Sequence, residues 1–218
     1  MIIDPASLER RELNALINGL VYPRPIAWVS TVSADGSRNL APFSFFNAFS
    51  FQPPTLGIGP GSRQGINKDS LRNIKETGEF VINAVNEEMM EIANLTSAEF
   101  DPEVDEWRIA SIQGEPSETI APEQVAESPT SFECRVKKIV ELGHEDAPSN
   151  SLVIGTVLRV HVIDEALFDG YKVRPEALNL VGRMGGPYWV RTRDYFPLAR
   201  PDSKDPNEVQ PEEPETAL

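Results

Sequence analysis

Short runs of β-branched and aromatic residues, separated by turn signals, dominate the hydrophobic pattern of the chain. Strands are predicted at residues 24–33, 38–42, 45–51, 55–59, 79–84, 131–142 and 152–164. The sequence Ala-Asp-Gly-Ser at 34–37 predicts a hairpin between the first two, and the two long strands at 131–142 and 152–164 are expected to form another. Helical spacing is limited to residues 7–18, 67–76 and 87–95, with a further short helix expected near 105–109. Gly78 is expected to stop the second of these helices. Because strands and helices do not alternate regularly, the pattern favours a small antiparallel barrel with helices at its edge over a doubly wound sheet.

Two stretches depart from this pattern. Residues 96–129 have little periodicity and several prolines, and we expect them to lie over the barrel as a cover. From residue 200 the chain is acidic and proline-rich, which is typical of a disordered tail or an extended arm. The sequence therefore predicts one domain over residues 1–199 and a tail over 200–218.

The acidic composition narrows the choice of partners. With 34 Asp and Glu against 20 Lys and Arg, the formal net charge is -14. Phosphate backbones and anionic membranes require basic patches, so neither a nucleic acid nor a membrane partner is expected. No apolar run approaches the roughly 20 residues that span a bilayer, and the N-terminus lacks the pattern of a signal peptide. We therefore expect a cytoplasmic protein.

The cysteine and histidine content predicts no metal site. Cys134 is the only cysteine, and we interpret it as a small packed residue. His144 and His161 fall on separate predicted elements without a partner at ligand spacing. We expect His144 to be solvent-exposed in an acidic loop. For His161, a strand histidine hydrogen-bonded to a neighbour is favoured over a functional role.

The clearest chemical signal is the loop that precedes the helix at 67–76. A helix N-terminus presents unpaired N–H groups and the positive end of the dipole, which suits a phosphate monoester. Hydroxyls and cations gather there, at Ser62, Arg63, Lys68 and Ser70. The alternative is an ordinary capped helix with solvated basic residues.

Upstream, polar side chains alternate with aromatic ones. The hydroxyl and amide groups are those of Ser30, Thr31, Asn39, Ser44 and Asn47, and the rings are those of Trp28, Phe43, Phe45 and Phe46. By strand alternation, Ser44 and Phe46 share one face, and Phe43, Phe45 and Asn47 share the other. A wall of this kind suits a planar heteroaromatic ligand. The alternative is a barrel interior on one face and a subunit interface on the other.

Several motifs occur in an order that resembles a known family. They include YPRPIAWVST, NLAPFSFFN, GIGPGSR, KDSLRNI, IGTVLRVHV and GRMGGPYW, spread over residues 13–197. Together they resemble the flavin reductase-like, FMN-binding split-barrel family, in the branch that includes the reductase components of two-component flavin monooxygenases. Relatives often have threonine at the position of Ser70, which keeps a hydroxyl.

The resemblance implies a mainly β fold: a six-stranded Greek-key antiparallel split β-barrel with a few short flanking helices. It implies a homodimer with one FMN per subunit near the subunit boundary. Ser44, Phe46 and Asn47 would then lie along the ribityl chain and ring edge. The phosphate would be surrounded by Ser62, Arg63, Lys68, Asp69 and Ser70. The strand on the cofactor side would contribute Trp28, Ser30 and Thr31.

The function that this resemblance implies is an NAD(P)H:flavin oxidoreductase. A nicotinamide would pass a hydride to the flavin, and the reduced flavin would go to a partner oxygenase or to dioxygen. The flavin carries the redox chemistry, so no obligatory acid or base is named. His161 and Arg183 are candidates to line the nicotinamide side. Two alternatives remain: an FMN-binding electron carrier, or an oxygenase whose pocket would be built from residues 96–129.

Overall fold

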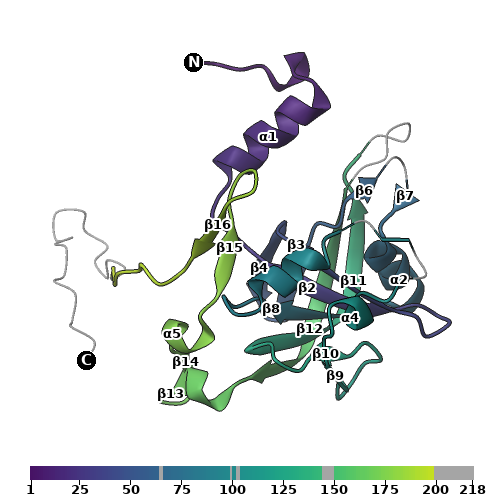
Figure 1. Cartoon of the computed structure of the whole chain (residues 1–218), viewed down its shortest axis with the longest axis vertical. Coiled ribbons are helices and arrows are strands. Elements are labelled where there is room, and N and C mark those ends of the chain that lie inside the picture. Colours follow the sequence, from purple (N-terminus) through teal and green to yellow (C-terminus); the bar gives the residue numbers. More distant parts are fainter. Residues whose placement is uncertain (64–65, 99, 102–103, 144–149, 199–218) are drawn as a thin grey trace.

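The computed structural model describes residues 1–63, 66–98, 100–101, 104–143 and 150–198, with the backbone alone at 62–63 and 66–67. His144 and the predicted tail at 200–218 lie outside the described residues. Within the described part, no helix is long and apolar enough to cross a membrane. The fold is mainly β with short helices, as expected (Figure 1).

The main sheet has seven antiparallel strands in the order β3-β2-β8-β11-β12-β5-β4, one more than the six expected. Their bounds are β2 (Ala27–Val32), β3 (Arg38–Phe43), β4 (Phe46–Phe51), β5 (Pro54–Ile58), β8 (Glu79–Ala84), β11 (Thr130–Glu141) and β12 (Ser151–Val162). The predicted hairpins β2–β3 and β11–β12 are both present. At the tip of the first, Gly36 has a φ of 89°, a value that favours glycine.

The two edge strands of this sheet, β3 and β4, are consecutive in the chain. Only Ser44 and Phe45 separate the end of β3 from the start of β4. Because so short a link joins opposite edges, the sheet must curl until the edges approach each other. β3 and β4 are not paired with each other, so the barrel is split at this point. We call Ser44, Phe45 and the adjoining strand ends the seam.

Both faces of the split barrel are covered, which explains why almost every residue of β2 is buried. One core cluster contains Ala27 and Val29 and is covered by α2 (Asp69–Thr77). The other contains Trp28 and is covered by α3 (Met90–Leu95) and α4 (Glu106–Ile109). The alternation of side chains along β2 thus assigns successive residues to different cores.

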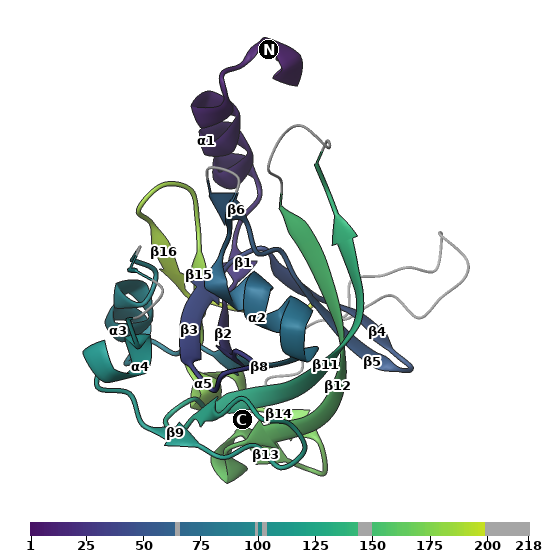
Figure 2. The same cartoon turned by 90° about the vertical axis from the view of Figure 1, so that its right-hand side faces the viewer.

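The helices begin later than their patterns predicted. α1 (Arg10–Leu20) follows a short 3-10 turn, η1 (Pro5–Ser7), and buries none of its residues. It projects from the barrel at the end of the molecule where the N-terminus lies (Figures 1 and 2). α2 ends where predicted, at Gly78, whose φ of 73° is left-handed.

The expected cover is present on the outer face of the barrel. It contains α4 and a small two-stranded sheet of β9 (Gly114–Glu115) and β10 (Gln124–Val125). The Val125 N–H donates to the Asn83 Oδ1 atom at 2.9 Å, which fixes the cover to β8. The indole of Trp28 donates to the Thr96 Oγ1 atom at 2.9 Å at the start of the cover.

Outside the main sheet, one hairpin reaches the base of α1, and another hairpin lies with a short helix at the opposite end of the molecule (Figure 1). β15 (Val181–Arg183) pairs with β1 (Arg24–Pro25) on one side and β16 (Trp189–Arg191) on the other. The small elements are β6 (Ser62–Arg63), β7 (Ile66–Asn67), η2 (Asp164–Ala166), β13 (Leu167–Phe168), β14 (Lys172–Val173) and α5 (Pro175–Leu178).

Candidate flavin site

The seam brings together three of the residues predicted along the flavin. The Ser44 hydroxyl accepts a hydrogen bond from the Arg24 Nε atom at 3.2 Å. Phe46 is half-buried against the barrel core, whereas Asn47 is exposed and its Oδ1 atom accepts from the Ala48 N–H at 2.8 Å. Ser44, Phe46 and Asn47 therefore form a continuous stretch at the open side of the barrel.

The seam also changes which face of the sheet the aromatic side chains occupy. Strand alternation through residues 43–47 predicts Phe43 and Phe46 on opposite faces. β3 ends at Phe43, and the corner at Ser44 and Phe45 resets the alternation. Phe43 belongs to the same core cluster against which Phe46 packs.

The N-terminus of α2 lies beside the same core. Lys68 is the N-cap residue, and its side chain forms no capping hydrogen bond within the described part of the chain. Its ammonium lies 5.4 Å from the centroid of the Phe43 ring. The Asp69 carboxylate, in the first turn, pairs with Arg72 at 2.6 Å. The charge of Asp69 is therefore offset by Arg72, and the Lys68 side chain reaches Phe43 at the end of β3.

Buried amides and hydroxyls attach α2 to the sheet. The Asn39 Nδ2 atom donates to the Ser70 hydroxyl at 2.8 Å, and the Asn73 Nδ2 atom donates to the Thr31 hydroxyl at 3.1 Å. All four residues are buried. The Asn73 Oδ1 atom is buried without a hydrogen-bond partner among the described residues. Ser70 and Thr31 therefore hold α2 in place, whatever else they contact.

Two of the predicted cofactor residues on β2 lie on the other face of the sheet. Trp28 is fully buried beneath the cover, and the Ser30 hydroxyl donates to the Glu123 carbonyl oxygen, also in the cover. Neither side chain lies on the face that α2 covers. The structure instead gives both of them a role in fixing the cover. The β6 backbone leads toward α2, but the side chains of Ser62 and Arg63 lie outside the described residues.

A large cavity opens beside the seam. Its volume is about 1130 Å³ and its walls are almost entirely apolar. The barrel contributes Phe46, Asn47, Ala48, Leu56, Ile82, Phe132 and Val160, and the C-terminal hairpins contribute Leu167, Tyr171, Val173, Leu180 and Val181. Residues 96–129, expected to supply any additional pocket, contribute none of its lining.

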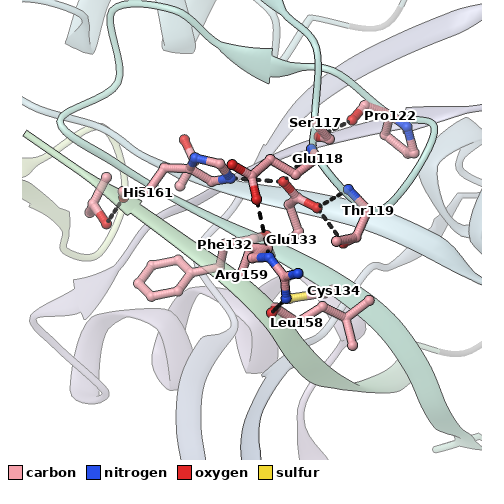
Figure 3. Close-up of polar contacts among 12 residues, drawn as sticks. Ser117, Glu118, Thr119, Pro122, Phe132, Glu133, Cys134, Leu158, Arg159 and His161 are labelled. Atoms are coloured by element: carbon pink, nitrogen blue, oxygen red, sulfur yellow. Dashed lines mark hydrogen bonds and ion pairs between the residues drawn. The ribbon is translucent and has the colours of Figure 1, made fainter.

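His161 has a partner that sequence reasoning missed. Its Nε2 atom lies 2.7 Å from the Oε1 atom of Glu133, which is fully buried (Figure 3). The Glu118 and Thr119 N–H groups donate to the same carboxylate at 2.7 and 2.8 Å, and so does the Thr119 hydroxyl. His161 is thus a strand histidine satisfied by a neighbour. The sequence signal for this buried carboxylate is a charged residue, Glu133, placed between the apolar residues Phe132 and Cys134.

The hydrogen bonds to Glu133 decide its protonation. Burial by itself would raise its pKa, but the donors from Thr119, Glu118 and His161 outweigh burial and lower the pKa to about 2. Next to it, Cys134 is buried, and burial followed by the Glu133 charge raises the pKa of its thiol to about 12. Cys134 therefore packs as a small apolar residue, as predicted.

Comparison with known proteins decides the family. A model of the flavin reductase like domain matches residues 19–180. The chain belongs to the flavin reductase-like family. Membership makes the protein a flavin-related oxidoreductase with a flavin cofactor, and the split-barrel fold agrees with the structure described above.

Relatives and solved structures of this family match most of the chain. An uncharacterized protein of Halalkalibacterium halodurans is 38% identical over 203 residues, which cover 92% of this chain and 97% of the relative. Component B of nitrilotriacetate monooxygenase from Bacillus cereus has a TM-score of 0.87 at 31% identity, covering 91% of this chain and 98% of that one. The 2-nitrobenzoate 2-nitroreductase of Pseudomonas fluorescens has a TM-score of 0.83 at 30% identity, covering 93% and 97%.

Proposed function

We propose that this protein is an FMN-dependent NAD(P)H:flavin oxidoreductase that supplies reduced flavin to a partner oxygenase or to dioxygen. The observation that carries the proposal is the N-terminus of α2 beside β3, where the Ser70 hydroxyl meets Asn39 near the start of the strand and the Lys68 ammonium lies over Phe43 at the seam. Similarity to component B of a monooxygenase supports the transfer of reduced flavin to a partner.

The described residues fit a flavin mononucleotide. A phosphate at the start of α2 would be held by the first-turn N–H groups and the Lys68 ammonium, with Ser62, Arg63 and Ser70 completing the site. Because Asp69 pairs with Arg72, its carboxylate charge is offset. The ring would lie at Ser44, Phe46 and Asn47.

When bound, the flavin supplies hydride and single-electron chemistry. The protein's contribution is binding and orientation. The seam residues would present one edge of the ring to hydrogen-bonding groups, and the apolar walls near Phe46 would keep water from its face. No described side chain is required as an acid or base in this scheme.

A homodimer and a cytoplasmic location belong to the same proposal. The edge strand β4 exposes Phe49 and Phe51, the latter at 90%. An exposed apolar edge of this kind favours association with a second copy. The amphipathic helix α1, which buries no residue in the single chain, offers a further contact surface.

Anaerobic reduction tests the proposal directly. We expect the purified protein to bind FMN and to bleach its absorbance on mixing with NADH or NADPH in a stopped-flow instrument. A preparation that neither takes up FMN nor oxidises either nucleotide in its presence contradicts the proposal. A bound flavin that a redox partner reduces and neither nucleotide does would favour an electron carrier.

The apolar cavity favours one second candidate, direct action on a small organic substrate. A volume of about 1130 Å³ beside the seam is enough for a drug-sized molecule next to the flavin ring. Similarity to 2-nitrobenzoate 2-nitroreductase is in line with this candidate. Substrate-dependent oxygen or nitro-group consumption by the isolated protein, without a partner enzyme, would support it.

A further inference from the structure

Two arginines lie side by side near the seam. Arg24 and Arg183 are directly opposite each other in the antiparallel pair of β1 and β15. Opposed residues in such a pair place their side chains on the same face, with Cβ atoms about 5 Å apart. Like charges in this arrangement repel, and Arg24 is only 7% exposed. Burial and the charge of Arg183 lower the pKa of Arg24, and burial lowers that of Arg183.

No carboxylate offsets this pair within the described residues. The chain carries 14 more acidic than basic residues, yet neither arginine takes part in an ion pair in that part of the chain. Buried cations ordinarily have an acidic partner. The fold therefore holds an excess of positive charge at this point, and an anionic ligand would offset it.

The two guanidinium groups differ in how many donors they use. Arg24 donates to four neutral acceptors: the Ser44 hydroxyl at 3.2 Å and the carbonyl oxygens of Asn18, Val21 and Met184 at 2.8, 2.5 and 3.1 Å. It is therefore fixed between α1, the seam and β15. Arg183 donates to the Gly186 carbonyl oxygen at 2.9 Å and forms no other hydrogen bond within the described residues, so most of its five donors are available to a ligand.

Aromatic rings flank the pair. The Arg24 Cζ atom lies 5.9 Å from the centroid of Phe45, and the Arg183 Cζ atom lies 5.0 Å from that of Trp189. Stacking of this kind holds a guanidinium plane while its edge remains available for hydrogen bonds. Paired arginine forks match the oxygen atoms of phosphate groups.

We propose that Arg24 and Arg183 form an anion site that takes the diphosphate of the pyridine nucleotide, with Arg183 donating to it and Arg24 positioning the pair. The assignment rests on the proposed reductase function. The phosphate of FMN is assigned in the proposed function to the N-terminus of α2, where Ser70 meets Asn39 near the start of β3. The bond from Arg24 to Ser44 places the arginine pair at the ring end, where a nicotinamide must meet the flavin. Two adjacent cations also match the two charges of a diphosphate.

Equilibrium binding of ADP tests this site without any turnover. Arg183→Ala removes the ligand-facing guanidinium, and Arg191→Ala removes an exposed arginine of the same hairpin whose charge is paired with Glu87. We expect Arg183→Ala to weaken ADP binding, measured by calorimetry on the FMN-loaded protein, by about 10- to 100-fold, as for hydrogen bonds to charged groups. Arg191→Ala should bind ADP like the wild type. The affinity for FMN, measured by fluorescence, should change less than twofold in both variants.

The outcomes separate this site from the reductase proposal. Undetectable ADP binding by the wild type, or equal ADP affinity in wild type and Arg183→Ala, overturns the site, even where NADH oxidation is observed. Loss of FMN affinity in Arg183→Ala with ADP affinity unchanged assigns the arginine to the flavin phosphate and also overturns it. Arg183-dependent ADP binding in a protein that oxidises neither nucleotide keeps the anion site and rejects the reductase.

Discussion

Replacing Glu133 by glutamine should release the cover from the β11–β12 hairpin. The carboxylate accepts from two backbone N–H groups, one hydroxyl and His161, all in a fully buried position. Glutamine keeps the shape but replaces one acceptor oxygen with an NH₂ donor that faces other donors. Buried groups left unpaired in this way cost about 1–3 kcal/mol each.

The pKa of Glu133 gives a second measure of the same interaction. A folded-state pKa of about 2 against an ordinary 4.5 corresponds to about 3 kcal/mol of stability. Because the folded pKa is depressed, this contribution is complete above the unfolded pKa of about 4.5. It is lost as the pH falls from there through about 2. Glutamine cannot ionise, so the difference between wild type and variant should shrink over the same range.

Urea unfolding at pH 7 and pH 3 measures this effect, with Glu118→Gln as the matched control. We expect Glu133→Gln to lower the free energy of unfolding by about 3 kcal/mol at pH 7 and by clearly less at pH 3. Glu118 forms an exposed ion pair with Arg159 at 3.1 Å, so its replacement should cost at most about 1 kcal/mol. In hydrogen exchange, the Thr119 amide should lose protection only in Glu133→Gln. A cost below 1 kcal/mol at pH 7, or a cost independent of pH, would refute the reasoning.

Three further predictions concern the site, the thiol and assembly. Lys68→Ala should weaken FMN binding with little change in stability, because Lys68 is exposed. Ser70→Ala should also lower the free energy of unfolding by about 1–3 kcal/mol, because it leaves the buried Asn39 amide unpaired. Fluorescence titration and urea unfolding separate the two effects, and unchanged FMN affinity in Lys68→Ala would remove the phosphate assignment. Cys134, with a pKa raised to about 12 and no exposure, should react with a disulfide reagent at pH 8 only after unfolding, and rapid labelling of the native protein would contradict its burial. Phe51→Asp on the exposed edge strand should shift a dimer toward monomers in light scattering, and a monomeric wild type would contradict the dimer itself.

Local sequence patterns were sufficient to predict the helices and strands but not the contacts among them. The strand at 79–84 and the stop of α2 at Gly78 followed directly from β-branched residues and a glycine. The N-terminal helix was predicted three residues early, because nothing in residues 7–9 distinguishes a helical turn from a capping segment. The prediction that Phe43 and Phe46 lie on opposite faces was wrong because the corner at Ser44 and Phe45 resets the strand alternation. Apolar residues on both sides of this corner hide it in the sequence.

What the sequence by itself determined was the fold class and the family, and it also indicated the stretch of chain where we propose the site. Strand periods, turn residues and the motifs around 24–47 and 61–70 are local, so they can be recognised without a structure. Only the tertiary structure decided which face each polar residue occupies. It placed Trp28 and Ser30 under the cover, joined His161 to Glu133, and set Arg24 opposite Arg183. These pairings join residues from 28 to 159 positions apart, and their register depends on how the whole sheet curls rather than on any local pattern.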